Sequence, residues 1–161
     1  MPFNEGMIKM FTRILYPTDF SDCSEKALEY VKKLKEAGTS EVIVFHVIDE
    51  RDIRTVSGSI VWLGETAEEY EEQVFSEMAT SAEEQLSAIK EELVDAGMKT
   101  SVRLVRGIPF KEILRIDETD EDISLIVIGS HGKSNVKEML LGSVSEKVIR
   151  KSKRPVLVVK R

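Results

Sequence analysis

Short apolar runs alternate along the chain with longer segments whose apolar positions recur every three or four residues. The short runs are rich in β-branched residues and predict strands at 13–17, 42–48, 100–106, 125–128 and 155–159. The longer segments predict helices between these strands. Strands that alternate with helices favour right-handed crossovers, and hence a parallel sheet covered by helices on both faces. The pattern therefore predicts a single-domain α/β fold, with no internal repeat.

The longest helical pattern begins after residue 65. Thr66 and Glu69 have the spacing of a capping box, in which each side chain bonds the backbone N–H of the other residue. An apolar stripe then continues at spacings of three and four until Gly97, which predicts one long helix. Residues 49–65 carry no regular pattern around the apolar residues 60–63. They predict a loop packed over the core, with a flexible flap or a partner contact as the alternatives.

Shorter helical patterns follow the first, third and fourth strands. The pattern after the third strand begins with Pro109, which suits a first helical turn. An acidic stretch follows at 117–122 and is expected to form a solvated loop. The pattern that begins at Ser143 is expected to turn Val148 and Ile149 inward.

Residues 125–145 combine a strand with glycines whose spacing suits a phosphate group. Gly129, Gly132, Gly142 and Ser143 form the pattern Gly-x2-Gly-x9-Gly-Ser. Glycine permits positive φ angles and lets a ligand approach backbone N–H groups, and a helix N-terminus attracts anions. A strand, a glycine-rich loop and a helix N-terminus together predict a phosphate site. The alternative is a strand-to-helix turn that merely requires glycines.

Two other phosphate-binding motifs do not fit the same stretch. Gly132, Lys133 and Ser134 match the end of a P-loop, but the position five residues before Gly132 is Val127, where that motif needs glycine. The dinucleotide pattern G-x-G-x-x-G fails as well, because position 127 is again not glycine.

Composition and charge exclude several classes of protein. The chain has 161 residues, of which 42% are hydrophobic and 32% charged, as in globular domains. No apolar segment approaches the length of about 18 residues that spans a membrane, so no membrane insertion is expected. Residues 1–10 are expected to form a loose N-terminal lead-in and no signal peptide, with the domain at 11–161. Cys23 is the only cysteine, which excludes an intrachain disulfide and favours a cytoplasmic protein.

The distribution of charge argues against a nucleic-acid partner. The net charge is −6, and basic residues are interleaved with acidic ones except for a cluster between Lys147 and Arg154. That cluster lies near a predicted helix C-terminus, where cations are favourable in any protein. A protein that binds duplexes normally presents a basic face, so no nucleic acid is expected.

Several stretches together resemble the universal stress protein family. The glycine pattern is similar to the ATP-binding motif of that family. Residues 14–21 resemble its first strand and turn, and 45–48 its second strand. Residues 107–109 resemble the turn after its third strand, and 155–159 its last strand. The resemblance covers about residues 10–161 in the order of the family.

The resemblance implies an open sheet with strand order 3-2-1-4-5, a Rossmann-like fold of the adenine nucleotide alpha hydrolase-like type. The strand order then switches between the first and fourth strands, where such sheets bind ligands, so Asp19 is expected to face the glycine loop. The resemblance also implies that ATP binds there. The residues implied to bind it are Pro17, Thr18, Asp19, Val47, Gly107, Ile128, Gly129, Ser130, His131, Gly132, Lys133, Ser134, Asn135, Gly142, Ser143, Val144 and Ser145.

Within this set, Pro17, Asp19 and Val47 are implied to hold the adenine and the ribose, and the glycine loop with the following helix the phosphates. A carboxylate accepts hydrogen bonds from a hydroxyl or an amino group, which suits this role. Two alternatives stay open: Asp19 caps its own turn, or Lys133 is a solvated lysine and not a counter-charge for phosphate.

No group of cysteine, histidine and acidic residues has the spacing of metal ligands. His46 lies in an apolar strand and is expected to be a hydrogen-bonded core histidine. His131 lies inside the loop, and for it two alternatives stay open: a contact with phosphate or, as the favoured one, a polar loop residue without that contact. Mg²⁺ or Mn²⁺ is expected to be held chiefly by the phosphates and water.

The resemblance implies a nucleotide-dependent switch or regulator in the stress response. Phosphoryl transfer needs charge stabilisation and a positioned nucleophile, and the loop shows neither an arginine nor a neighbouring base. Hydrolysis of ATP is therefore expected to be slow at most, and no catalytic residue is assigned. The alternatives are an ATP-driven enzyme and a nucleotide-independent dimeric scaffold. A protein partner is also expected, and the sequence does not identify it.

The resemblance also implies a homodimer. Val156–Val159 is a strongly apolar run that lies at a sheet edge in the family's strand order. Proteins cover, charge or pair such edges, and pairing with a second copy needs one self-complementary patch. The alternative is that a loop or the N-terminal residues cover this edge.

Overall fold

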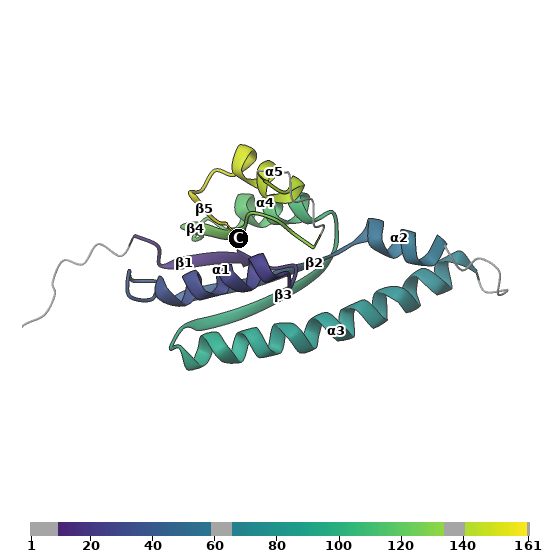
Figure 1. Ribbon diagram of the computed structural model, residues 1–161, viewed down its shortest axis with the longest axis horizontal. Helices are drawn as coiled ribbons and strands as arrows, with labels where there is room; N and C mark the ends of the chain where they lie inside the picture. The colour runs from purple at the N-terminus through teal and green to yellow at the C-terminus, as the bar shows by residue number, and fades with distance from the viewer. Residues whose placement is uncertain (1–9, 59–65, 134–140, 161) are drawn as a thin grey trace, which may run out of the picture.

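The computed structural model describes residues 10–58, 66–133 and 141–160 (Figure 1). The strands are β1 (Arg13–Pro17), β2 (Glu41–Asp49), β3 (Lys99–Gly107), β4 (Leu125–Gly129) and β5 (Val156–Val159). The helices are α1 (Asp22–Lys33), α2 (Glu50–Gly58), α3 (Ala67–Asp95), α4 (Pro109–Thr119) and α5 (Ser143–Lys151).

The strands form one sheet in the order β3-β2-β1-β4-β5, with every adjacent pair parallel. This confirms the predicted order 3-2-1-4-5. Helices α1 and α3 cover one face of the sheet, and α4 and α5 cover the other (Figure 1). β1 lies between β2 and β4, so the strand order reverses between β1 and β4.

Alternate residues of the central strands fill two separate cores. On the α1 and α3 face, Tyr16 and Val44 pack with Leu86 of α3. On the α4 and α5 face, Phe45 packs with Val148 of α5. The strands are thus buried on both faces, which explains why their sequences read as continuous apolar runs.

The long helix predicted after Thr66 is confirmed as α3, which has 29 residues. The Thr66 side chain accepts a bond from the backbone N–H of Glu69, and the Glu69 side chain accepts one from the backbone N–H of Thr66. This helix is the longest in the described ranges, and none of the helices there is apolar over a length that would cross a bilayer.

The loop predicted over residues 49–65 is wrong at its beginning, because α2 runs through Glu50–Gly58. Ile53 is fully buried there and packs with Ile48 and Val74. A single apolar residue held by distant partners gives too short a stripe to be seen in the sequence. The apolar residues 60–63 lie outside the described residues, as does the expected N-terminal lead-in except for Met10.

Two further expectations are wrong. The acidic stretch is not wholly a solvated loop, because α4 continues through Thr119 and Asp117 is 1% exposed. The Asp117 carboxylate accepts bonds from the Ser152 hydroxyl and the Lys153 backbone N–H, both at 3.0 Å. In α5, Val148 is buried as expected, whereas Ile149 is 39% exposed.

Candidate functional site

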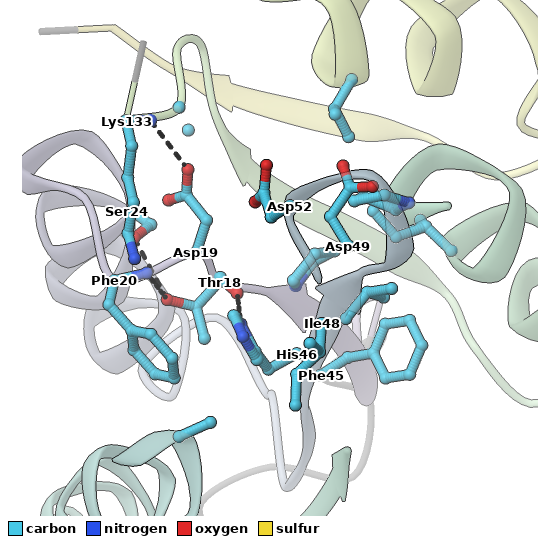
Figure 2. Close-up of a pocket in the computed structure, with 18 of the residues that line it drawn as sticks. Thr18, Asp19, Phe20, Ser24, Phe45, His46, Ile48, Asp49, Asp52 and Lys133 are labelled. Atoms are coloured by element: carbon cyan, nitrogen blue, oxygen red, sulfur yellow. Dashed lines mark hydrogen bonds between the residues drawn. The ribbon is translucent and has the colours of Figure 1, made fainter. Parts of the chain in front are cut away.

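A cavity of about 690 Å³ lies at the carboxyl end of the sheet, around the switch between β1 and β4 (Figure 2). This volume is in the range of pockets that hold small-molecule ligands. The predicted site residues that line it are Pro17, Thr18, Asp19, Val47, Ile128, Gly129, His131, Gly132, Lys133, Gly142, Ser143, Val144 and Ser145. Gly107, at the end of β3, and Ser130 do not line it, and Ser134 and Asn135 lie outside the described residues.

Asp19 joins the turn after β1 to the glycine loop. One carboxylate oxygen accepts hydrogen bonds from the backbone N–H and the hydroxyl of Ser21, at 3.1 and 2.5 Å. The other accepts one from the backbone N–H of Lys133 at 3.1 Å (Figure 2). Asp19 therefore faces the glycine loop, as expected, and also caps its own turn.

The glycines of the loop are needed for close approach. A Cβ on Gly132 would lie 2.6 Å from Oδ2 of Asp19, and one on Gly129 would lie 3.0 Å from the backbone of Cys23. A Cβ on Gly142 would lie 3.2 Å from the backbone oxygen of Ser130. In the described ranges, positive φ angles occur in glycines only at Gly38 and Gly97, so positive φ does not explain this loop.

The N-terminus of α5 opens onto the cavity without a side-chain cap. Gly142 is the N-cap residue, and within the described ranges no side chain caps the N–H groups of the first turn. The N–H groups at the start of a helix have no intrahelical acceptor, and they carry part of the positive end of the helix dipole. Ser143, Val144 and Ser145 all line the cavity. This arrangement provides backbone donors for an anion.

Ser130 holds this helix start against β4 and β5 from behind the cavity wall. Its backbone oxygen accepts bonds from the Gly142 N–H at 2.7 Å and the Ser145 hydroxyl at 2.8 Å. Its own N–H donates to the oxygen of Val159 at 2.8 Å. Its hydroxyl oxygen lies 2.8 Å from Nδ1 of His131.

His46 is hydrogen-bonded, as expected, and it also lines the cavity, which the sequence did not predict. Its Nδ1 lies 2.7 Å from the backbone oxygen of Thr18, and because a carbonyl only accepts, Nδ1 carries the proton. Burial lowers the pKa of His46, although the bond to Thr18 opposes the shift. The Phe20 ring lies 4.4 Å from the imidazole, centroid to centroid, and Phe20 adopts a φ of 61°.

The wall formed by α2 and α3 was not predicted either. Asp49 and Asp52 bring carboxylates to this side (Figure 2), and Glu77 and Met78 of α3 line it as well. Arg51 pairs with Asp49, and although burial opposes it, the bonds from Arg51 lower the pKa of Asp49. The end of β2, α2 and α3 supply these residues, and the packing of α2 on α3 that brings them together is not indicated by any local motif in the sequence.

Charge and polarity divide the cavity into three regions. The glycine loop, Lys133 and the start of α5 form a region suited to an anion. Phe45, Val47, Ile113, Ile128 and Val144 form an apolar wall on the α4 and α5 side. The third region is the acidic α2 and α3 wall. Within the described ranges, no group of three or more histidine, cysteine and acidic side chains is placed to hold a metal ion.

Comparison with known proteins assigns this architecture to a family. Residues 10–160 match the model of the universal stress protein family. Universal stress protein MJ0577 of Methanocaldococcus jannaschii is 46% identical over 160 residues, which cover 96% of this chain and 98% of that protein. The solved structure of MJ0577, described as a hypothetical protein whose biochemical function was assigned from its structure, has a TM-score of 0.82. It is 47% identical and covers 94% of this chain and 97% of its own.

Two more distant solved structures share the fold. One is a universal stress protein in complex with cAMP, 22% identical with a TM-score of 0.59, which covers 94% of this chain and 98% of its own. The other is a universal stress protein family protein of Arabidopsis thaliana with AMP bound, 14% identical with a TM-score of 0.55, which covers 93% of this chain and 92% of its own. The family model spans nearly the whole chain, and the M. jannaschii protein matches it along almost its full length. This chain therefore belongs to the universal stress protein family.

Proposed function

We propose that the chain binds ATP in this cavity and acts as a nucleotide-dependent switch or regulator in the stress response, in the cytoplasm. The observation that carries the proposal is the uncapped N-terminus of α5 beside the glycine loop, at the switch in strand order. Backbone donors, the positive end of a helix dipole and Lys133 meet there, and phosphate is the anion that such sites take most readily.

The apolar wall suits the base of the nucleotide. Pro17 ends β1 and Val47 lies near the end of β2, and both line the cavity together with Ile113 and Ile128. A planar base buries apolar surface against such a wall while its phosphates reach the α5 terminus. The solved universal stress proteins that hold cAMP and AMP support an adenine nucleotide, although at their identities they share only the fold with this chain.

A divalent cation fits this arrangement only as a companion of the phosphates. The described lining residues offer no set of three ligands, and Asp19 is already engaged by Ser21 and Lys133. Mg²⁺ keeps several waters and is commonly bound through substrate phosphates, and we expect Mg²⁺ or Mn²⁺ to be held in that way. When bound, the cation would offset the charge of the phosphates.

We expect slow hydrolysis at most. Among the described lining residues, the permanent cations are Lys133 and Arg51, and Arg51 is engaged by Asp49. Fast phosphoryl transfer needs a cation at the transferring group and a residue that orients the nucleophile. Lys133 can supply charge there, but the described lining offers no arginine free of a carboxylate partner and no residue that we assign to orient the nucleophile, so turnover should stay far below the ordinary enzyme value of about 10 per second.

The second candidate function is a dimeric scaffold that needs no nucleotide. The exposure of the edge strand β5 supports a dimer. β5 is an edge strand of four residues, and Val156–Val158 are only half-buried. We propose that β5 pairs with β5 of a second copy, whether the protein acts as a switch or as a scaffold. A protein partner would then bind the dimer.

Calorimetry on verified nucleotide-free protein distinguishes the switch from the scaffold. With Mg²⁺ or Mn²⁺ present, we expect ATP to bind with a dissociation constant of about 1 μM or lower, a free energy of about −8 kcal/mol. GTP serves as the matched ligand, because it has the same phosphates and a different base. No heat with ATP under these conditions would contradict the proposal and leave the scaffold.

A further inference from the structure

The residue behind the phosphate region connects two parts of the molecule with different proposed roles. Ser130 is 1% exposed and does not line the cavity. Its backbone oxygen accepts the Gly142 N–H and the Ser145 hydroxyl, both at the start of α5. Its backbone N–H donates to Val159, the last residue of β5. One peptide segment thus holds both the helix start and the end of the edge strand.

The two edges of β5 are used differently. Ile126 donates its N–H to the oxygen of Pro155, and Ser130 donates to that of Val159, with Val159 beside Gly129 in the register. Because backbone groups alternate along a strand, the odd-numbered residues of β5 bond β4, and Val156 and Val158 direct their N–H and C=O groups outward. The thiol of Cys23 also donates to the oxygen of Val159, at 3.3 Å. The inner edge at Val159 is therefore tied to Ser130, while no strand in the described part of the chain pairs with the outer edge.

We infer that Ser130 is a positioning residue through which nucleotide binding and pairing of β5 with a second copy strengthen one another. The inference rests on the proposed function, because it needs phosphates at the start of α5 and a dimer through β5. Phosphates bound by the α5 N–H groups fix that helix start against the glycine loop. The Ser130 carbonyl is fixed with it, and so is the N–H that holds Val159.

The element that responds is β5 itself. It is four residues long, is paired only with β4 among the described strands, and has only half-buried side chains at Val156–Val158 before the buried Val159. Ordering a residue costs conformational entropy, and this free energy must otherwise come from pairing with the second copy. A nucleotide that orders β5 beforehand lowers this cost. Linkage then requires that dimerisation raise nucleotide affinity, with gains at the two sites of the dimer whose product equals the change in the dimer constant.

Sedimentation measurements of the monomer–dimer equilibrium test the coupling with an unmodified chain. The dimer dissociation constant is measured without ligand, with saturating Mg-ATP and with saturating adenosine, which lacks the phosphates. We expect Mg-ATP to lower this constant about tenfold, within the usual range of allosteric coupling, and adenosine to leave it unchanged. Calorimetry on the same samples reports binding separately.

Binding of ATP with an unchanged dimer constant overturns the coupling and leaves the proposed function intact. Absence of ATP binding overturns the proposed function, and the coupling with it. An equal effect of adenosine contradicts the route through α5, because adenosine has no group for that helix terminus. A wild-type chain that stays monomeric overturns the coupling as well, and is recognised by the same sedimentation data.

Two variants separate the route through Ser130 from a general stabilisation of the fold. Ser145→Ala removes the hydroxyl that donates to the Ser130 oxygen and should reduce the tenfold effect at saturating Mg-ATP. Ser130→Ala keeps both backbone bonds and should retain the effect, which makes it the matched control. Hydrogen exchange at Leu157 and Val159, measured below the dimer constant, should slow with Mg-ATP and not with adenosine. Exchange that does not respond to Mg-ATP contradicts the inference.

Discussion

The carboxylate of Asp19 accepts a hydrogen bond at 3.1 Å from the backbone N–H of Lys133, a residue 114 positions further along the chain. The same side chain binds the N–H and hydroxyl of Ser21 through its other oxygen. Asp19 therefore fixes the glycine loop relative to the turn after β1. The parallel sheet makes this contact possible, because β1 and β4 are neighbours and their carboxyl ends meet.

Replacement of Asp19 by asparagine should weaken ATP binding about tenfold while the fold persists. An amide has one acceptor oxygen, so it cannot serve both Ser21 and Lys133, and the loss of a charge-assisted bond costs about 1.5–3 kcal/mol. Calorimetry measures the affinity, and thermal unfolding should show a small drop in the melting temperature. Asp22→Asn is the matched control, because Asp22 is exposed in the first turn of α1. Unchanged ATP affinity in Asp19→Asn would show that this contact does not shape the site.

Valine at Gly132 or at Gly142 should abolish ATP binding without unfolding the chain. A Cβ at Gly132 meets Oδ2 of Asp19 at 2.6 Å, and one at Gly142 meets the Ser130 oxygen at 3.2 Å, so each loop must move. A branched side chain would also fill space that backbone donors leave for phosphate. Circular dichroism reports the fold and calorimetry the binding. Gly58→Val is the control, since a Cβ there has no neighbour within 4 Å. Wild-type affinity in both loop variants would mean that the phosphates bind elsewhere.

The sequence predicted those parts of the fold that local patterns determine. The strands are buried on both faces, so the β-branched runs mark them closely, and β1 has the predicted bounds of 13–17. The strand order came from the resemblance, and with it the expectation that Asp19 faces the loop. Helix α2 was missed because its buried residue Ile53 packs with Ile48 of β2 and Val74 of α3, and not with other residues of its own helix.

The site was predicted where a motif exists and missed where only packing creates it. The glycine pattern marks the wall formed by the loop and α5. Phe20, in the turn after β1, packs on His46 of β2, and residues of α3 line the cavity because that helix packs beside the sheet. Asp117 was misjudged because its neighbours in the sequence are acidic and solvated, while its own partners are Ser152 and Lys153. Contacts between distant segments leave no local periodicity to read.

Stability should fall as the pH drops below about 6.5, in part because of His46. Burial holds the pKa of His46 below its ordinary value of 6.5, so the unfolded chain binds a proton that the folded chain does not. Stability then rises with pH between the lowered pKa and 6.5 and is lost as the pH falls through that window. Chemical denaturation at several pH values should show a weaker dependence in His46→Gln. His131→Gln removes the other histidine and should retain the His46 contribution. An identical pH dependence in wild type and His46→Gln would contradict this prediction.

Proline at position 158 should prevent dimerisation and leave the β4–β5 ladder intact. Val156 and Val158 direct their backbone groups to the open edge, because Pro155 and Val159 are the residues that accept bonds from the side of β4. In an antiparallel pair about a two-fold axis, Val156 of one copy would exchange both bonds with Val158 of the other. Val158→Pro removes that donor, as proline lacks an N–H group. Light scattering at micromolar concentration should show a dimer for the wild type and a monomer for this variant.

Leu157→Pro provides the contrast, because residue 157 faces β4. It should remove a bond inside the sheet and lower the melting temperature, whereas Val158→Pro should change the melting temperature little at concentrations where both chains are monomeric. The difference between the two positions follows from the alternation of backbone groups along β5 and not from hydrophobicity, since both residues are half-buried. A wild-type chain that is monomeric at micromolar concentration would contradict the assignment of β5 as the dimer strand. A Val158→Pro chain that still dimerises would place the interface on another surface.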